Sequence, residues 1–169
     1  MTDRPKGLAN RSSNYGDRDF ALYLRRSFAA SMGYSRAMLE KPVVGIADTA
    51  SDYNNCHRTV PELIEAARRG VLAAGGLPLA FPTVSLCEPS LNPCSMHYRN
   101  LMALDTEAML SAQPMDCVVL VGGCDKTVPA QLMGAASADI PAIMLVTGPM
   151  LAQRFEGERL AACTDCRRY

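Results

Sequence analysis

The stretch Cys117-Val-Val-Leu-Val-Gly-Gly-Cys-Asp-Lys-Thr127 decides the fold class of this chain. It opens with a short apolar run rich in β-branched valine, which predicts a strand buried on both faces. Two glycines and a polar segment follow, and Pro129 stands where the first turn of a helix accepts proline. The stretch therefore predicts a strand, a polar loop and a helix in succession.

The same order recurs along the chain. Apolar runs predict further strands at 43–47, 79–86 and 140–146. Helical spacing of apolar residues predicts helices from 60 to about 74 and from about 97 to 112. Thr59-Val-Pro-Glu62 has the spacing of a capping box at the start of the first of these helices. Alternating strands and helices indicate an α/β fold, and we expect a mostly parallel, doubly wound sheet flanked by helices.

The N-terminal segment differs in character. Residues 1–16 are polar and rich in turn formers, so we expect an N-terminal arm, followed by a single α/β domain at 17–169. From Asp17 onward, Phe20, Leu24 and Phe28 recur at a spacing of four. This spacing predicts an amphipathic helix that ends near Gly33 and packs its apolar stripe into the core.

Composition excludes several classes of function. Lys plus Arg and Asp plus Glu number 17 each, and this balance gives no support for binding nucleic acid or an anionic membrane. No apolar run approaches the length of a membrane span, and residues 1–7 do not resemble a signal peptide, so we expect a cytoplasmic protein. Without an export signal, an odd number of cysteines favours free thiols or metal ligands over disulfides; they are Cys56, Cys87, Cys94, Cys117, Cys124, Cys163 and Cys166.

Three loops carry residues that suit chemistry. Cys56, Glu88 and Cys124 each follow a predicted strand, and loops at the carboxyl ends of parallel strands meet at one edge of the sheet. A cysteine at a helix N-terminus has a lowered pKa, so we expect Cys124 to be a readily formed thiolate and a soft ligand. Asp125 beside it offers hard oxygen ligands.

Each residue also fits a plainer role. Gly-Gly-Cys124 also fits a tight turn with a small buried thiol, and Cys56 also fits packing against a helix start. Glu88 also fits the usual fate of a carboxylate, an exposed surface position. Cys163-Thr-Asp-Cys166 lacks the second ligand pair that a zinc site requires. The convergence of three loops, more than any single residue, favours a functional site.

Several blocks together resemble the dihydroxy-acid and 6-phosphogluconate dehydratase family. They cover nearly the whole chain and include Arg11-Ser-Ser-Asn-Tyr-Gly16, Gly45-Ile-Ala-Asp-Thr-Ala-Ser-Asp-Tyr-Asn-Asn-Cys-His57, Phe81-Pro-Thr-Val-Ser-Leu86 and Gly122-Gly-Cys-Asp-Lys-Thr127. Many family members have Ser-Asp-Gly where this chain has Cys87-Glu-Pro89. The glutamate resembles the sugar-acid branch, typified by arabinonate and xylonate dehydratases.

The resemblance implies two metal cofactors. The family binds an iron–sulfur cluster through three cysteines, two of which match Cys56 and Cys124, and in the sugar-acid branch the cluster is 2Fe-2S rather than 4Fe-4S. A magnesium ion lies beside the cluster at positions that match Glu88, Asp125 and a carbamylated Lys126. We also expect Thr127 and His57 to contact the substrate.

The implied reaction is the dehydration of an aldonate to a 2-keto-3-deoxy acid by a homo-oligomeric hydro-lyase. The alternatives are a dihydroxy-acid dehydratase of branched-chain amino-acid synthesis, a 6-phosphogluconate dehydratase, and a non-catalytic truncated module for metal binding or dimerisation. The family's third cluster cysteine and its catalytic serine, which lies in a carboxyl-terminal β-rich domain, have no match before Tyr169. We therefore expect a fragment that carries only part of the site and is inactive alone, and in the non-catalytic alternative Cys163 or Cys166 substitutes as a cluster ligand.

Overall fold

A parallel sheet of four strands forms the centre of the protein. The computed structural model describes residues 5–148 and 151–160. The sheet has the order β2-β1-β3-β4, with β1 Val43–Asp48, β2 Leu77–Pro82, β3 Cys117–Gly122 and β4 Ala142–Val146. The α/β class and the parallel sheet predicted from the sequence are confirmed.

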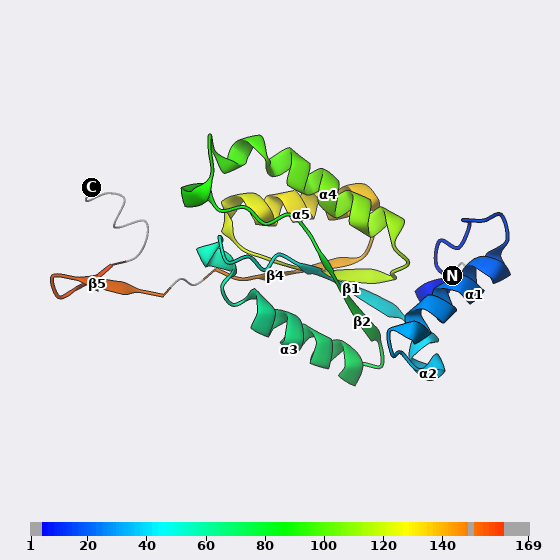
Figure 1. The fold of residues 1–169 in the computed structure, drawn as a ribbon. Coiled ribbons are helices and arrows are strands. Elements are labelled where there is room, and N and C mark those ends of the chain that lie inside the picture. The colour runs from blue at the N-terminus through cyan, green and yellow to red at the C-terminus, as the bar shows by residue number, and fades with distance from the viewer. Residues whose placement is uncertain (1–4, 149–150, 161–169) are drawn as a thin grey trace.

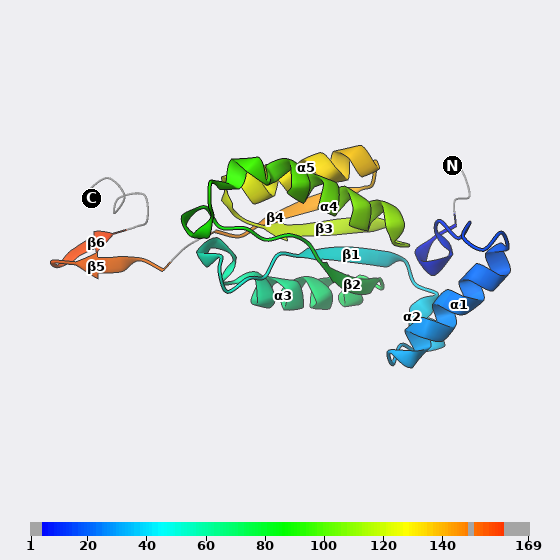
Figure 2. The ribbon, with the colours of Figure 1, turned by 45° about the horizontal axis from the view of Figure 1, so that its top comes forward.

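Helices cover both faces of this sheet. Helix α3 (Val60–Ala73) lies on one face, and α4 (Arg99–Ala112) and α5 (Cys124–Ala138) lie together on the other (Figures 1 and 2). On the α3 side, Ile46 and Val121 pack against Val60 and Ile64. On the other side the core contains Ala47, Leu77, Leu110, Val118, Leu120 and Ala135. Because alternate strand residues face opposite layers, this arrangement has the three layers of a doubly wound fold.

Two local predictions fail for identifiable reasons. The strand expected at 79–86 lies at 77–82, and its ladder closes where Thr83 N donates to Asp48 O at 3.0 Å. The capping box at Thr59 does not form, because the Thr59 side chain makes no bond to the helix start. Its hydroxyl instead lies 2.9 Å from the hydroxyl of Thr147, beyond β4. A tertiary contact therefore replaces the local one.

Helices α1 (Arg18–Ser31) and α2 (Arg36–Leu39) precede the sheet and lie at the amino ends of its strands (Figure 2). The predicted helix is present, and Asp17 caps it by accepting from Asp19 N at 2.8 Å. The expected core packing of its stripe is wrong: Phe20 is 48% exposed and Phe28 is 69% exposed. The helix packs inward through Ala21 and Ala29, small residues that allow close approach.

The N-terminal arm is held against the domain where the structure describes it. Its 3-10 helix, Gly7–Ala9, donates from Gly7 N to the Asp116 carboxylate, the nearer oxygen at 2.8 Å. The same carboxylate oxygen accepts from Val43 N at 2.8 Å, so Asp116 joins the arm to the start of β1. Arg25 of α1 donates to the carbonyls of Leu8 and Asn10 at 2.8 and 2.6 Å.

A small antiparallel hairpin follows the sheet. It consists of β5 (Gln153–Phe155) and β6 (Glu158–Leu160), and it lies apart from the layered domain (Figure 1). Both turn residues, Glu156 and Gly157, have positive φ, which suits the tight turns of hairpins. The sequence analysis did not predict this hairpin. None of the helices in the described residues has the length and apolar composition needed to cross a membrane.

Candidate functional site

The loop after β1 presents Cys56 at the carboxyl edge of the sheet. Asn54 is 1% exposed and anchors the loop, since its side-chain oxygen accepts from Cys56 N at 3.1 Å. Its amide nitrogen donates to Leu86 O, also at 3.1 Å, in the segment that follows β2. The local asparagine geometry thus fixes Cys56 and joins the first two of the three predicted loops.

His57 joins the same loop to the third one. Gly123 N donates to its Nε2 at 2.9 Å, so this nitrogen carries no proton. Nδ1 therefore carries the proton and lies 2.8 Å from its acceptor, the carbonyl oxygen of Thr49. The ring is 1% exposed, and it holds the residue before Cys124 against the loop that carries Cys56. This geometry makes His57 a positioning residue, and its contact with substrate stays a prediction.

Cys124 begins α5 in an unusual backbone conformation. Its φ is +69°, which a residue with a side chain rarely adopts. Gly123 before it has no room for a side chain, since a Cβ there would lie 2.9 Å from Thr147 O. The Gly-Gly-Cys stretch therefore allows a close backbone approach to the end of β4 and turns the thiol toward Cys56. Strain of this kind is characteristic of functional sites.

Cys56 and Cys124 are brought together. Burial of the Cys124 thiol, together with its hydrogen bond to Cys56, raises the pKa of Cys124 to about 12. The expected acidification at the helix N-terminus is therefore wrong, because burial and a second thiol oppose it. Both thiols are free and partly exposed. Two adjacent neutral thiols are suited to lose their protons to a metal that binds them.

Glu88 also reaches this edge, by a longer route than expected. It does not follow β2 directly but opens a 3-10 helix, Glu88–Ser90, after the connecting residues 83–87. Its carboxylate accepts hydrogen bonds from both the hydroxyl and the backbone N–H of Ser95. These bonds lower the pKa of Glu88, the hydroxyl contributing most. The carboxylate is thereby held ionised and oriented.

Lys126 lies between two carboxylates. Its Nζ is 2.8 Å from Asp125 Oδ2 and 3.8 Å from Glu88 Oε2. The hydrogen bond to Asp125 raises the pKa of Lys126. The ammonium group therefore stands where two acidic side chains gather around a positive charge. Carboxylate oxygens of this kind are the ligands that Mg²⁺ prefers.

The donor chemistry fits the two expected cofactors. Thiols of Cys56 and Cys124 suit iron, and the carboxylates of Glu88 and Asp125, which already flank a cation, suit magnesium. Within the described residues, His, Cys, Asp and Glu side chains do not gather in threes in a way that could hold a single metal ion. The site thus supplies a thiol pair next to a carboxylate pair, and the full ligand set of either metal stays a prediction.

Thr127 lies behind this edge. It is 0% exposed, and its hydroxyl has no hydrogen-bond partner among the described residues. A substrate contact through this hydroxyl stays a prediction. Cys163 and Cys166, the expected substitute ligands, lie outside the described residues.

Three supporting residues did not emerge from the sequence analysis. Asn54 anchors the Cys56 loop, and Ser95 orients Glu88. Cys87, counted only as a free thiol, points its Sγ to Asn55 Oδ1 at 3.2 Å. The position of Cys87 directly before Glu88 is the sequence feature that could have indicated its place at this site.

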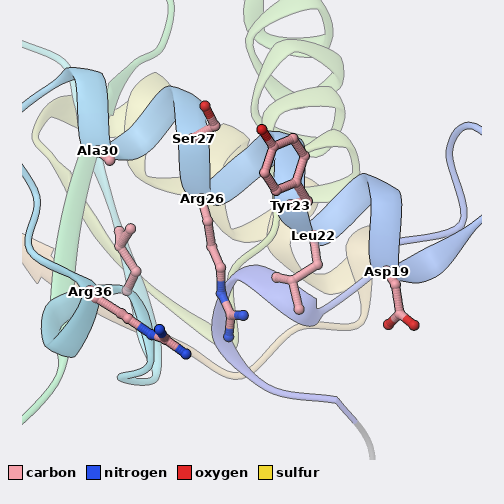
Figure 3. A pocket seen from close by; sticks show the side chains of 8 residues that line it. Asp19, Leu22, Tyr23, Arg26, Ser27, Ala30 and Arg36 are labelled. Carbon is pink, nitrogen blue, oxygen red and sulfur yellow. The ribbon is translucent and has the colours of Figure 1, made fainter.

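A groove of about 560 Å³ lies elsewhere, between α1 and α2 (Figure 3). Leu22, Tyr23, Arg26 and Arg36 are among the residues that line it. Because both helices lie at the amino ends of the strands, the groove is separate from the thiol pair (Figure 2). It holds none of the residues that were predicted to carry chemistry.

Comparison with known proteins identifies the family of this chain. Residues 41–168 match the family model described as dihydroxy-acid/6-phosphogluconate dehydratase N-terminal. This span contains all of the predicted metal ligands, and its class is that of an α/β N-terminal dehydratase domain. The chain belongs to the dihydroxy-acid/6-phosphogluconate dehydratase family.

Several curated relatives carry names of particular enzymes. An L-arabinonate dehydratase of Rhizobium leguminosarum is 43% identical over 92% of this chain and 27% of its own length. A D-xylonate dehydratase of Caulobacter vibrioides is 40% identical, over 85% of this chain and 24% of its own length. A dihydroxy-acid dehydratase of Clostridium novyi is 39% identical, over 80% of this chain and 25% of its own length. The chain thus spans about a quarter of the length of these relatives.

Proposed function

We propose that this chain supplies the metal-binding part of a sugar-acid dehydratase, a hydro-lyase that converts an aldonate such as arabinonate or xylonate to a 2-keto-3-deoxy acid. One observation carries the proposal: the paired thiols of Cys56 and Cys124 lie at the same sheet edge as Glu88, Asp125 and Lys126. The names of the arabinonate and xylonate relatives support this substrate class.

The proposed cofactors are a 2Fe-2S cluster at the thiols and Mg²⁺ at the carboxylates. When bound, the cluster supplies a Lewis-acidic iron for a departing hydroxyl, and Mg²⁺ supplies a grip for the substrate carboxylate and its neighbouring hydroxyl. Glu88, oriented by Ser95, and Asp125 hold the cation in place of the Lys126 ammonium. Carbamylation of Lys126 removes that positive charge and adds a third carboxylate-like group at the same point.

The protein's own structure positions these groups. His57 ties the loop of Cys56 to Gly123, which precedes Cys124. The N-terminus of α5 adds a partial positive charge that favours an anionic substrate at this edge. Both effects come from the chain's own residues.

The relative named dihydroxy-acid dehydratase favours a second substrate class, 2,3-dihydroxy branched-chain acids. Glu88 in the Cys-Glu-Pro sequence supports the sugar-acid class over this one. A binding assay on the metal-loaded chain distinguishes the two substrate classes. The ligands tested are arabinonate, xylonate, a 2,3-dihydroxy branched-chain acid and 6-phosphogluconate. Tighter Mg²⁺-dependent binding of the aldonates is the expected result.

The metal part of the proposal is tested first. The chain is reconstituted anaerobically with iron and sulfide, and iron and acid-labile sulfide per chain are measured with the visible spectrum. We expect loading in the native chain, loss in Cys56→Ser and Cys124→Ser, and retention in Cys117→Ser, whose thiol begins β3 at the far end of the sheet. Equal loading of all four proteins would show that the thiol pair is not the cluster site.

A further inference from the structure

We propose that the groove between α1 and α2 receives α1 of a second copy of this chain, so that the protein forms a symmetric dimer. The groove has a volume of about 560 Å³, and Asp19, Leu22, Arg26 and Ala30 line it from the α1 side. These residues recur at helical spacing, and Figure 3 shows Asp19, Leu22 and Arg26 projecting to the same side of the helix. They form a stripe along α1 that a second helix can contact.

Two charged residues of this stripe are unpaired within the described part of the chain. Neither Asp19 nor Arg26 forms an ion pair with any residue of 5–148 and 151–160. The Nε of Arg26 is also buried, without a hydrogen-bond partner among those residues. A guanidinium nitrogen removed from water without an acceptor is costly. Arg26 therefore favours the approach of a carboxylate from another molecule.

The positions of the two charges make the stripe complementary to itself. Asp19 and Arg26 are seven residues apart, which is close to two helical turns and roughly 10 Å along the axis. When two α1 helices pair antiparallel about an axis that passes between Leu22 and Tyr23, each Asp19 lies opposite the Arg26 of the other copy. A two-fold axis thus gives two identical ion pairs, as an isologous interface requires.

The middle of the stripe, between the two charges, suits an interface centre. Leu22 is half-buried at the groove wall, and Tyr23 next to it is 65% exposed. Tyrosine is enriched at interfaces, and an apolar centre with a polar rim is their usual arrangement. Ser27 and Ala30 also line the groove, and their small side chains allow a second helix to come close. Docking of a second α1 therefore covers Tyr23 and pairs both charges.

The groove lies at the opposite end of the sheet from the candidate metal site. Helices α1 and α2 lie at the amino ends of the strands (Figure 2), whereas Cys56 and Cys124 follow the carboxyl ends of β1 and β3. A dimer formed through α1 leaves the candidate site of each copy open. The inference therefore goes beyond the proposed function and does not depend on it.

Sedimentation velocity over a series of concentrations measures the association, and charge reversal locates it. We expect a native monomer–dimer equilibrium that Asp19→Arg and Arg26→Asp each weaken at least roughly tenfold, because each change creates two like-charge contacts across the axis. An equimolar mixture of the two variants should restore the dimer. In the mixture one chain carries two positive charges on the stripe and the other carries two negative charges, so both ion pairs form again.

Matched controls lie on α3. Glu62 and Arg69 are exposed and have the same spacing of seven residues, so Glu62→Arg and Arg69→Asp repeat the two charge changes away from the groove. These controls should leave the dimer unchanged, and circular dichroism checks that all four variants fold. A native chain that stays monomeric at every concentration overturns the proposal. A dimer that the α1 variants do not weaken, or that the α3 controls weaken equally, overturns it too, as does a mixture that stays monomeric.

Hydrogen exchange of the native chain covers the case in which an α1 variant does not fold. Exchange is measured at a low and a high protein concentration, and mass spectrometry of the peptides locates it. Slower exchange within 18–31 at the high concentration, with 60–73 unchanged, supports the proposal. Exchange of α1 that does not depend on concentration overturns it.

Discussion

Replacement of His57 by alanine tests how the two thiol loops are held together. The substitution leaves Gly123 N without its acceptor, now 2.9 Å away, and Thr49 O without its donor, now 2.8 Å away. Each buried polar group left unpaired costs about 1–3 kcal/mol. Taking about 2 kcal/mol for each, we expect the free energy of unfolding to fall by about 4 kcal/mol.

The chain contains an internal control for this change. His97 is the other histidine, and it is exposed at the end of a 3-10 helix, Ser95–His97. His97→Ala removes the same ring from the surface, where most substitutions change stability by less than about 0.5 kcal/mol. Comparison of His57→Ala with His97→Ala therefore separates the loss of the two buried hydrogen bonds of His57 from the loss of an imidazole ring in general.

Urea unfolding followed by circular dichroism measures the difference. With a slope of about 2 kcal/mol per molar urea, a loss of about 4 kcal/mol moves the midpoint down by about 2 M. The same variant should load less iron, since Cys56 and Cys124 lose their common support. Midpoints of the two alanine variants that agree within about 0.3 M would refute the assigned role of His57.

Three further outcomes follow from single contacts. Gly134→Ala should destabilise the chain by about 2 kcal/mol, because its Cβ would lie 2.7 Å from the backbone oxygen of Ala103 where α4 and α5 cross. Gly70→Ala meets no atom within 4 Å and should stabilise α3 by about 0.5–1 kcal/mol, so equal urea midpoints of the two variants would contradict the close crossing. Ser95→Ala should raise the pKa of Glu88, measured by NMR titration, and an unchanged titration would contradict the hydrogen bond as the cause of the lowered pKa. Because the pKa of Glu88 in the folded chain lies below its ordinary 4.5, the carboxylate stabilises the fold above pH 4.5, and this stabilisation is lost as the pH falls through the pKa of the folded chain. Alkylation of Cys124 in the apo chain should be slow at neutral pH, because its pKa is raised to about 12, and fast labelling there would show that the helix N-terminus dominates over burial.

The sheet and its helices could be predicted because their signals are local. The apolar run at 117–121 and the glycines after it need no distant partner to define a strand and a close turn. The failures all involve contacts between distant segments. Phe20 and Phe28 share the spacing of a core stripe, and only the packing of α1 through Ala21 and Ala29 shows that they face outward. Thr59 has the sequence of a capping residue, and only the position of Thr147 shows where its hydroxyl goes.

In the candidate site, the position of the residues could be predicted from the sequence, whereas their ionisation could not. Parallel strand order alone predicts that Cys56, Glu88 and Cys124 meet at one edge, because that order places all three loops at the carboxyl ends of neighbouring strands. The ionisation of those groups follows from their neighbours instead. A helix N-terminus acidifies a thiol in isolation, yet Cys124 is buried against a second thiol and is harder to ionise. A raised thiol pKa in the apo chain means that a metal must displace protons in order to bind, so loading of this site should strengthen as the pH rises. The positive φ of Cys124 and the two bonds of His57 show that the protein's own contacts stabilise this costly arrangement.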